Sequence, residues 1–577
     1  MQELPKTPNI YDLKLWKRFW EISRLYWNSE EKRRARGVLA LLLLLMAGSA
    51  LIAVKISYIS SDFLTALSKM DRQGFNHGLL LYLVAYAVST PTEVYKTYIE
   101  NSLRVNWRLW LTNHFLEKYL ANRAYYHIND LLDVDNPDQR ISENIADFTR
   151  SSLGYISTIF QNLILFCSFA GVLWSVSIKL VLVLLLYAAI GTLVTIVLGR
   201  PLLHLNFQVQ QKSADFRYGL VHIRDHAESI AFFRGEGREA QQIMQRLQKL
   251  ISNKLTLIGQ ERNLGFFTSI FKALPGILPF VVLAPDYFSG KIEFGILALG
   301  ANAFSRVLSS ITIIVEMFNS LSNFAAKITR VESFAAALTP PVQENTVGGL
   351  PTIGSQEGSR LALKGVTLQT PDYRRTLIRN VTAEVLPGTG MLIAGASGAG
   401  KSSILRAIAG LWNTGEGEIS RPPLHEMLFL PQRPYMIHGT LREQLHYPNL
   451  DRDVSDEELG ALLEKVKLDG LHNRFGGFDA VMDWGHLLSL GEQQRLAFAR
   501  LLITGPRYAI LDEATSALDV TNEARLYRQL QESAMTFVSV GHRPSLLAYH
   551  DNVLELQGNA TWRLVPAGEF QITVGSL

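Results

Sequence analysis

Long stretches without charge constrain this chain more than any other feature. From Ser151 to Ile178 no residue is charged, and after Lys179 the stretch Leu180–Gly199 again carries no charge. A bilayer core about 30 Å thick is crossed by about 20 apolar residues in a helix. Because lipid offers the backbone no hydrogen-bond partner, helices and closed barrels are the structures that span it. We therefore expect two membrane-spanning helices here, joined in a hairpin near Lys179.

Four further stretches have similar length and fewer than three charges each. Phe75–Ile99 is the weakest of them, because Glu93 and Lys96 lie near its end. Pro275 and Pro279 should kink the stretch Leu264–Tyr287, since proline breaks the backbone hydrogen-bond ladder of a helix. The four stretches are Gly37–Ile59, Phe75–Ile99, Leu264–Tyr287 and Phe294–Phe318. With the hairpin they give six expected spans.

Charge and polarity indicate how these spans are oriented. Basic residues gather before the first span, which favours a cytoplasmic N-terminus, and six crossings return the C-terminal half to the cytoplasm. The basic residues before the first span are Lys14, Lys17, Arg18, Arg24, Lys32, Arg33, Arg34 and Arg36. The polar stretches Glu100–Arg150 and Arg200–Asn263 have helical patterns, and we expect long helices that continue into the cytoplasm. The lipid bilayer is thus an expected partner, in a bacterial cytoplasmic membrane or an internal membrane.

Residues Ile10–Trp27 predict an amphipathic helix. Leu13, Trp16, Trp20 and Trp27 recur at helical spacing, with lysines and arginines between them. Such a helix can lie in the membrane interface or pack on protein. We expect an interfacial helix within residues 1–36.

Composition excludes several classes of protein. With 577 residues, 48% of them hydrophobic and 19% charged, the chain is too apolar to remain disordered. Its net charge of +4 provides no global basic field, so no nucleic-acid partner is expected. A single cysteine, Cys167, excludes an intramolecular disulfide framework and a cysteine-based zinc site. Because Cys167 lies in an uncharged stretch, we expect it to be a small core residue.

Beyond a linker rich in proline, glycine and polar residues, the pattern changes to short strands alternating with helices. Met391–Ala394 is typical of a buried strand. The next residues read Gly-Ala-Ser-Gly-Ala-Gly-Lys-Ser, which matches a phosphate-binding loop at every fixed position and precedes a helix. Glycines let backbone amides approach the phosphates. We expect Lys401 to contact the β- and γ-phosphates of ATP and Ser402 to bind Mg²⁺.

The expected nucleotide-binding residues of this loop are Gly395, Ser397, Gly398, Gly400, Lys401, Ser402 and Ser403.

A second apolar strand, Tyr508–Leu511, ends in two carboxylates. Asp512 fits the group that holds Mg²⁺, and Glu513 is placed to polarise the attacking water. ATP hydrolysis is the chemistry that this combination predicts. The domains expected from the whole chain are 1–36, a transmembrane domain at 37–338, a linker at 339–358 and a nucleotide-binding domain at 359–577.

The segment Leu488-Ser-Leu-Gly-Glu-Gln-Gln-Arg495 resembles the signature of ATP-binding cassette transporters. In that family the nucleotide lies between the phosphate loop of one domain and the signature of another. The resemblance implies that Ser489, Gly491 and Glu492 contact nucleotide across a dimer interface. It also implies that Gln432 is a catalytic and metal-contacting glutamine.

Two more roles follow from the same resemblance. Asp519, in Ser-Ala-Leu-Asp, is similar to the aspartate of a loop that contacts nucleotide, and His542 is similar to the switch histidine that contacts the γ-phosphate. The sequence departs from the family at two places. Leu490 stands where glycine is usual, and Thr370 stands where an aromatic residue would stack on adenine. Tyr373 could stack instead, or be an ordinary turn tyrosine.

The resemblance narrows to half-transporters of subfamily D and bacterial relatives of the YddA and SbmA type. It rests on Phe429–Met436, Gly439–Arg442, Tyr447-Pro448 and His226–Gly235. It implies an all-α, six-helix transmembrane domain of the exporter type, then an α/β nucleotide-binding domain, in a domain-swapped homodimer. Glu228 is either at the junction between membrane helices and nucleotide domain or a solvated glutamate.

Cargo is the least determined property. Glu93, Lys96, Lys272 and Arg306 are candidates for a wet cavity, because ionisable residues in spans are costly; snorkelling or structural pairing is the alternative. Mixed charges favour a hydrophilic or amphiphilic cargo, cobalamin-like or peptide. A long-chain fatty acid or acyl-CoA transporter is the alternative, and a non-transport ATPase or a regulatory channel is a second one.

Overall fold

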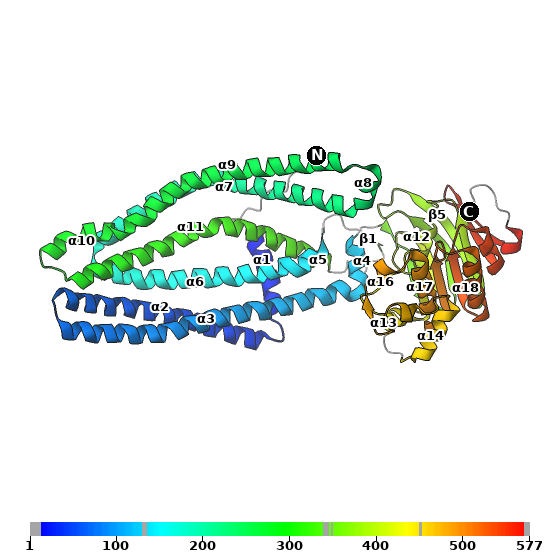
Figure 1. Ribbon diagram of the computed structural model, residues 1–577, viewed down its shortest axis with the longest axis horizontal. Helices are drawn as coiled ribbons and strands as arrows, with labels where there is room; N and C mark the ends of the chain where they lie inside the picture. Colours follow the sequence, from blue (N-terminus) through cyan, green and yellow to red (C-terminus); the bar gives the residue numbers. More distant parts are fainter. Residues whose placement is uncertain (1–12, 130–135, 339–345, 348–349, 449–452, 571–577) are drawn as a thin grey trace. The chain divides into compact units, whose positions relative to one another are not determined.

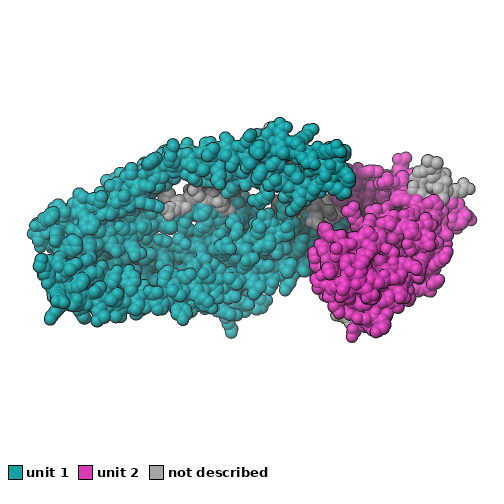
Figure 2. Space-filling view, in the orientation of Figure 1, with its two compact units in different colours: residues 1–340 teal, residues 341–577 magenta. Residues whose placement is uncertain are grey.

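The computed structural model describes residues 13–129, 136–338, 346–347, 350–448 and 453–570. The chain forms two compact units, residues 1–340 and residues 341–577, which Figure 2 shows in different colours. Each is described by itself.

Unit 1 is helical. Figure 1 shows three pairs of long helices running side by side: α2 with α3, α6 with α11, and α7 with α9. The helices are α1 (Leu13–Trp27), α2 (Lys32–Ser68), α3 (Arg72–Leu120), α4 (Ala124–Asn129), α5 (Pro137–Gln139), α6 (Ile145–Val176), α7 (Ile178–Asp225), α8 (Ala227–Phe233), α9 (Glu236–Ala273), α10 (Leu278–Phe288) and α11 (Phe294–Ala337).

Five helical stretches of the described residues are long and apolar enough to cross a membrane. They are Lys32–Ser68, Pro137–Val176, Ile178–Asp225, Glu236–Phe288 and Phe294–Ile313. The second expected span, residues 75–99, lies in α3 and is not among them, because Glu93, Lys96 and neighbouring threonines make it more polar. Helix α3 nevertheless packs along α2, which is one of the five. The sixth crossing stays a prediction.

The expected turns are present. Helix α6 ends at Val176, and the Ser177 hydroxyl caps α7 by accepting a hydrogen bond from the Leu180 amide at 3.4 Å, so the predicted hairpin forms. A short 3₁₀ turn, Leu274–Gly276, separates α9 from α10 at the predicted prolines. The polar stretch after Gly199 continues α7 to Asp225 as one helix of 48 residues.

Helix α1 has two apolar faces. Leu15, Ile22 and Tyr26 are buried in a cluster with residues of α3, α6 and α11. Trp16 and Trp20 are exposed on the other side. The sequence left packing on protein and lying in the interface as alternatives, and the two faces allow the helix to do both.

Cys167 is exposed on α6, so the expectation of a core position is wrong. Lipid tails are as apolar as leucine, and a side chain of a membrane helix therefore gains little by facing protein instead of lipid.

Unit 2 is built on two sheets. In the six-stranded sheet the order is β14–β13–β6–β12–β11–β8, and all neighbours run parallel except β13 and β14. In the four-stranded sheet the order is β3–β7–β4–β5. One hydrophobic cluster fills the space between the sheets and another packs helices on the larger sheet.

The strands are β1 (Thr346–Val347), β2 (Leu350–Pro351), β3 (Gly354–Glu357), β4 (Leu361–Gln369), β5 (Thr376–Val385), β6 (Gly390–Gly395), β7 (Gly415–Arg421), β8 (Met427–Leu430), β9 (Gly439–Thr440), β10 (Val481–Met482), β11 (Tyr508–Asp512), β12 (Thr536–Val540), β13 (Asn552–Gly558) and β14 (Thr561–Pro566). The helices are α12 (Lys401–Ile408), α13 (Leu441–His446), α14 (Asp456–Lys465), α15 (Leu471–Arg474), α16 (Trp484–Leu487), α17 (Leu490–Thr504) and α18 (Val520–Glu532). Strands β1, β2 and β3 lie within the segment expected as a linker, and β3 pairs with β7.

A buried histidine makes unit 2 sensitive to acid. The His550 ring packs on Tyr527 and Phe537, and its Nδ1 donates to the Leu546 carbonyl at 2.7 Å. Burial lowers the pKa of His550 to about 4. An unfolded histidine has a pKa of about 6.5, so the unfolded state holds more protons between these values and stability falls as the pH is lowered through this window.

We expect this histidine to remove about 3 kcal/mol of stability between pH 6.5 and pH 4. In the variant His550→Gln the amide can still donate to Leu546 but does not titrate. Its unfolding temperature should therefore fall less than that of the parent between pH 7 and pH 5. Equal falls, measured by differential scanning fluorimetry, would contradict the assignment.

Candidate nucleotide-binding site

The expected site residues meet at one edge of the larger sheet. Strands β6, β12, β11 and β8 are parallel neighbours, so their carboxyl ends share this edge. The phosphate loop follows β6, His542 follows β12, Asp512 ends β11, and Gln432 follows β8. In open α/β sheets ligands bind at the carboxyl ends of the strands.

The phosphate loop needs its glycines at two positions. Gly395 has φ of 143°, and a Cβ there would lie 2.5 Å from the Leu556 carbonyl oxygen. Gly400 caps α12 with φ of 99°. Both conformations are rare for other residues. Ser397 and Gly398 are exposed in the loop, and Ser403 lies in the first turn of α12, where free amides favour an anion.

Lys401 is 7% exposed at the start of α12. Its Nζ donates to the carbonyls of Gly395 at 2.6 Å and Ala396 at 3.0 Å, so the ammonium lies over the loop. Burial lowers the pKa of Lys401, and the charges of Glu513 and Asp512 oppose this. A partly desolvated cation here is suited to bind phosphate.

Asp512 and Ser402 are in contact, as expected for a shared metal site. The Ser402 hydroxyl donates to Oδ1 of Asp512 at 3.0 Å. Burial raises the pKa of the Asp512 carboxyl, and the hydrogen bond from Ser402 opposes this. Among the described residues no group of three or more His, Cys, Asp or Glu side chains could hold a metal.

The three expected catalytic side chains are joined through Glu513. Nε2 of Gln432 donates to one carboxylate oxygen at 2.8 Å, and Nε2 of His542 lies 2.9 Å from the other. Glu513 has φ of 49°, in the left-handed region that non-glycine residues seldom adopt. Its amide donates to the Val540 carbonyl at 3.1 Å. The carboxylate is thus held from both sides, in a strained conformation typical of functional positions.

The signature segment forms the start of α17. Ser489 caps the helix and Glu492 completes a capping box, because its Oε2 accepts from both the amide and the hydroxyl of Ser489 at 2.9 Å. Arg474 also donates to Glu492 at 2.9 Å. Burial alone would raise the pKa of Glu492, but these hydrogen bonds outweigh it and lower the pKa. Gly491 lies beside the Ala517 carbonyl, where a Cβ would approach to 3.2 Å.

Two other expected site residues have structural partners. Asp519 caps α18, and its Oδ1 accepts from the Asn522 amide at 2.8 Å. Tyr373 is in a turn with φ of 57°, and its hydroxyl donates to the Pro351 carbonyl at 3.0 Å. Stacking on adenine stays a prediction for Tyr373.

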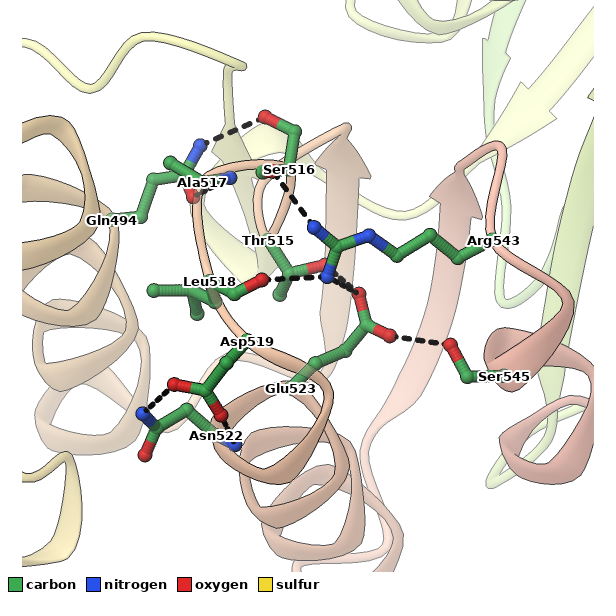
Figure 3. Close-up of polar contacts among 10 residues, drawn as sticks. All are labelled: Gln494, Thr515, Ser516, Ala517, Leu518, Asp519, Asn522, Glu523, Arg543 and Ser545. Atoms are coloured by element: carbon green, nitrogen blue, oxygen red, sulfur yellow. Dashed lines mark hydrogen bonds and ion pairs between the residues drawn. The ribbon is translucent and has the colours of Figure 1, made fainter.

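Sequence reasoning missed three polar side chains that hold the site together: Gln494, Glu523 and Arg543 (Figure 3). Gln494 and Glu523 are each 1% exposed. A polar residue that interrupts the apolar face of a helix is the signal that could have found Gln494 and Glu523. For Arg543 the sequence offers a single signal, its position directly after His542.

Known proteins are similar to this chain over nearly its whole length. A family model described as ABC transporter transmembrane region 2 matches residues 22–288, and one described as ABC transporter matches residues 378–516. An uncharacterized ABC transporter ATP-binding protein of Synechocystis sp. is 43% identical over 92% of this chain and 81% of its own length. ABC transporter D family member 2, chloroplastic, of Arabidopsis thaliana is 38% identical, over 94% and 86%. The lysosomal cobalamin transporter ABCD4 of Homo sapiens is 32% identical, over 96% of both chains.

The chain therefore belongs to the ABC transporter family, as a half-transporter of the D type. It is a multi-pass integral membrane protein that binds ATP and couples its hydrolysis to transport across the membrane. The expected fold, helical membrane region followed by an α/β nucleotide-binding domain, is confirmed.

Proposed function

We propose that two copies of this chain move a hydrophilic or amphiphilic cargo, cobalamin-like or peptide. One observation carries the proposal: a polar cluster among the membrane helices, here called the midspan cluster, of Ser49 (α2), Glu93 and Lys96 (α3) and Gln161 (α6). Lys96 is 8% exposed, forms an ion pair with Glu93 and donates to Oε1 of Gln161 at 3.2 Å. Gln161 in turn donates to the Ser49 hydroxyl at 3.5 Å.

The position of this cluster along the membrane helices indicates a path for polar cargo. Ser49 and Gln161 lie near the middle of the apolar stretches 37–59 and 151–178. The contact with Gln161 brings Lys96 to the same level, although it was expected near the end of the stretch 75–99. Charge at that depth is expensive and marks pathways for polar substrates. The Glu93 side chain is 55% exposed, so an acceptor is accessible beside the buried ammonium. Such a pair of donor and acceptor suits amide, hydroxyl or phosphate groups better than an alkyl chain.

The other two cavity candidates are on α9 and α11. Lys272 is exposed on α9, and the Arg306 guanidinium lies 5.9 Å from the centre of the Phe169 ring. The name of the human relative supports a cobalamin-like cargo, and the name of a 27% identical Escherichia coli relative, inner membrane ABC transporter ATP-binding protein YddA, supports a bacterial cytoplasmic membrane.

The proposed partner is a second copy of the chain. Ser489 and Gly491 would contact the nucleotide bound to the partner's phosphate loop, so one composite site needs two nucleotide-binding domains. An apolar seam on α9 supports the dimer: Met244, Leu247, Ile251 and Leu255 recur every three or four residues on a stretch expected outside the membrane. Except for Leu247 they are exposed, as the contact face of a helix is before its partner covers it.

Mg²⁺ fits the donors present. Ser402 offers a hydroxyl, Asp512 a carboxylate and Gln432 an amide oxygen, a sparse oxygen set of the kind that binds Mg²⁺ together with substrate phosphates. When bound, the ion would neutralise charge on the β- and γ-phosphates. Glu513 accepts the proton of the attacking water, while Gln432 and His542 orient its carboxylate.

ATP binding favours the closed pair of nucleotide-binding domains, and hydrolysis releases it. We propose that α8 passes this movement to the membrane helices. It is a short helix at the turn between α7 and α9, and Phe232 and Phe233 are 78% and 87% exposed on it. Glu228 lies exposed in its first turn.

Reconstitution tests the cargo. In proteoliposomes cobalamin or peptide should stimulate ATP hydrolysis, and Lys96→Gln should remove most of this stimulation, because the buried ammonium that would bind the cargo is lost. Lys69→Gln, which breaks an exposed pair with Glu293, is the matched control and should keep the stimulation.

Other outcomes select the alternatives. Stimulation by acyl-CoA alone would identify a fatty acyl transporter, and cargo flux that continues without hydrolysis would identify a channel. Stimulation of Lys96→Gln equal to that of the parent would remove the midspan cluster from the cargo path.

A further inference from the structure

One arginine fastens the loop of residues 515–519, here called the hub loop, to the segment that carries the switch histidine. Arg543 donates through Nη1 to the Leu518 carbonyl at 2.7 Å and through Nη2 to the Ser516 carbonyl at 3.0 Å. Figure 3 shows the guanidinium reaching into the hub loop. Both acceptors in the hub loop are backbone carbonyls, so these two hydrogen bonds depend on the backbone conformation of the loop and not on its side chains.

A buried carboxylate supports this arginine. Glu523 of α18 is 1% exposed, and its Oε2 accepts from the Thr515 hydroxyl at 2.9 Å and from Nη1 of Arg543 at 3.3 Å. Its Oε1 accepts from the Ser545 hydroxyl at 2.6 Å. A buried carboxylate with all its partners fixes their geometry, because breaking the set leaves charge unpaired.

The opposite side of the hub loop is held by the signature helix. Nε2 of Gln494 donates to the Ser516 hydroxyl at 3.2 Å and to the Gln432 carbonyl at 3.0 Å. Oε1 of Gln494 accepts from the Ala517 amide at 3.0 Å. The hub loop is therefore connected on one side to Gln432 and on the other to the residue next to His542.

We propose that Arg543 is a positioning residue that couples the hub loop to His542. Glu513 begins the chain segment that leads into this loop, and His542 precedes Arg543. The bonds of Arg543 to the loop therefore hold Glu513 and His542 at the spacing of their 2.9 Å contact.

This role of Arg543 rests on the proposed roles of Glu513 and His542, and the polar contacts of the arginine are to the hub loop and Glu523. Lysine at position 543 would keep the charge but lose the planar fork that reaches two carbonyls at once. We expect Arg543→Lys to lower kcat for ATP about tenfold and to leave KM within about twofold, because alignment is lost while the phosphate loop is untouched.

The experiment uses the full-length protein in proteoliposomes and measures kcat, KM for MgATP and the unfolding temperature. Arg563→Lys is the matched control, since Arg563 also pairs with a buried carboxylate, Glu555, but on β13 and β14 away from the hub loop. It should keep the parent kcat and KM. If Arg543→Lys does not fold, the double variant Arg543→Gln/Glu523→Gln, which removes the buried negative charge together with the positive one, is measured instead with the same expectation.

A parent-like kcat in the variant at position 543 would overturn the proposal, as would a loss of kcat that merely follows the loss of folded protein. Failure of the underlying assignment has a different signature: Glu513→Gln would then hydrolyse ATP at the parent rate, whatever happens at position 543.

Discussion

Glu513→Gln should hydrolyse ATP at least about 100-fold more slowly than the parent, because general-base catalysis contributes about 10²–10⁴ in rate. The glutamine retains the shape of the side chain but cannot accept the proton of the attacking water. ATP should therefore bind and remain, and the variant should accumulate as a closed dimer with trapped ATP. Retained radiolabelled ATP, together with the phosphate release rate, measures both effects.

The contacts around Glu513 make this variant informative. Gln432 and His542 lie 2.8 Å and 2.9 Å from its two oxygens, and an amide can keep one contact as acceptor. Glu532→Gln is the matched control, since this exposed glutamate ends α18 outside the site. Hydrolysis by Glu513→Gln at the parent rate would remove Glu513 from its assigned role.

Lys401→Ala should abolish tight ATP binding. Its Nζ lies over the phosphate loop, and a charge-assisted hydrogen bond contributes about 1.5–3 kcal/mol. At about 1.4 kcal/mol for each factor of ten, affinity should fall about 10- to 100-fold. The change also removes two contacts that order the loop, to the carbonyls of Gly395 and Ala396. Equilibrium binding of a fluorescent ATP analogue to the protein in detergent measures the loss.

Two further variants separate the charge of Lys401 from the size of its side chain. If the lysine side chain serves only to fill space beside the loop, Lys401→Met should bind ATP nearly as well as the parent, because its side chain is of similar length. Lys465→Ala, at the exposed end of α14, controls for the loss of a positive charge. Normal affinity in Lys401→Ala would overturn the phosphate-loop assignment.

Much of this site could be predicted from local sequence. The phosphate loop and the acidic pair after β11 lie at fixed distances from strands, and parallel strands bring their carboxyl ends to one edge. The loop glycines, Asp512 and Glu513 are therefore found together as expected. Helices with long apolar faces were equally visible, since a run of about 20 hydrophobic residues matches the thickness of a bilayer core.

Contacts between distant segments could not be predicted. Gln494 and Glu523 interrupt the apolar faces of their helices, which marks them as buried polar residues, but no local spacing identifies the partners that they and Arg543 have on other elements. Phe75–Ile99 shows a similar limit: its polar residues argue against a span, while Lys96 finds Gln161 on α6, 65 positions away. The environment of a membrane side chain depends on helix pairing, and the prediction for Cys167 was wrong for that reason.

The exposed position of Cys167 on α6 has a practical consequence. A thiol-reactive nitroxide or dye would attach at a single place in each copy, with no cysteine to remove beforehand. In a pair of identical chains two such labels give one symmetric distance, free of the ambiguity of mixed labelling. The distance between the two labels on Cys167 can therefore report opening and closing of the membrane helices through a transport cycle.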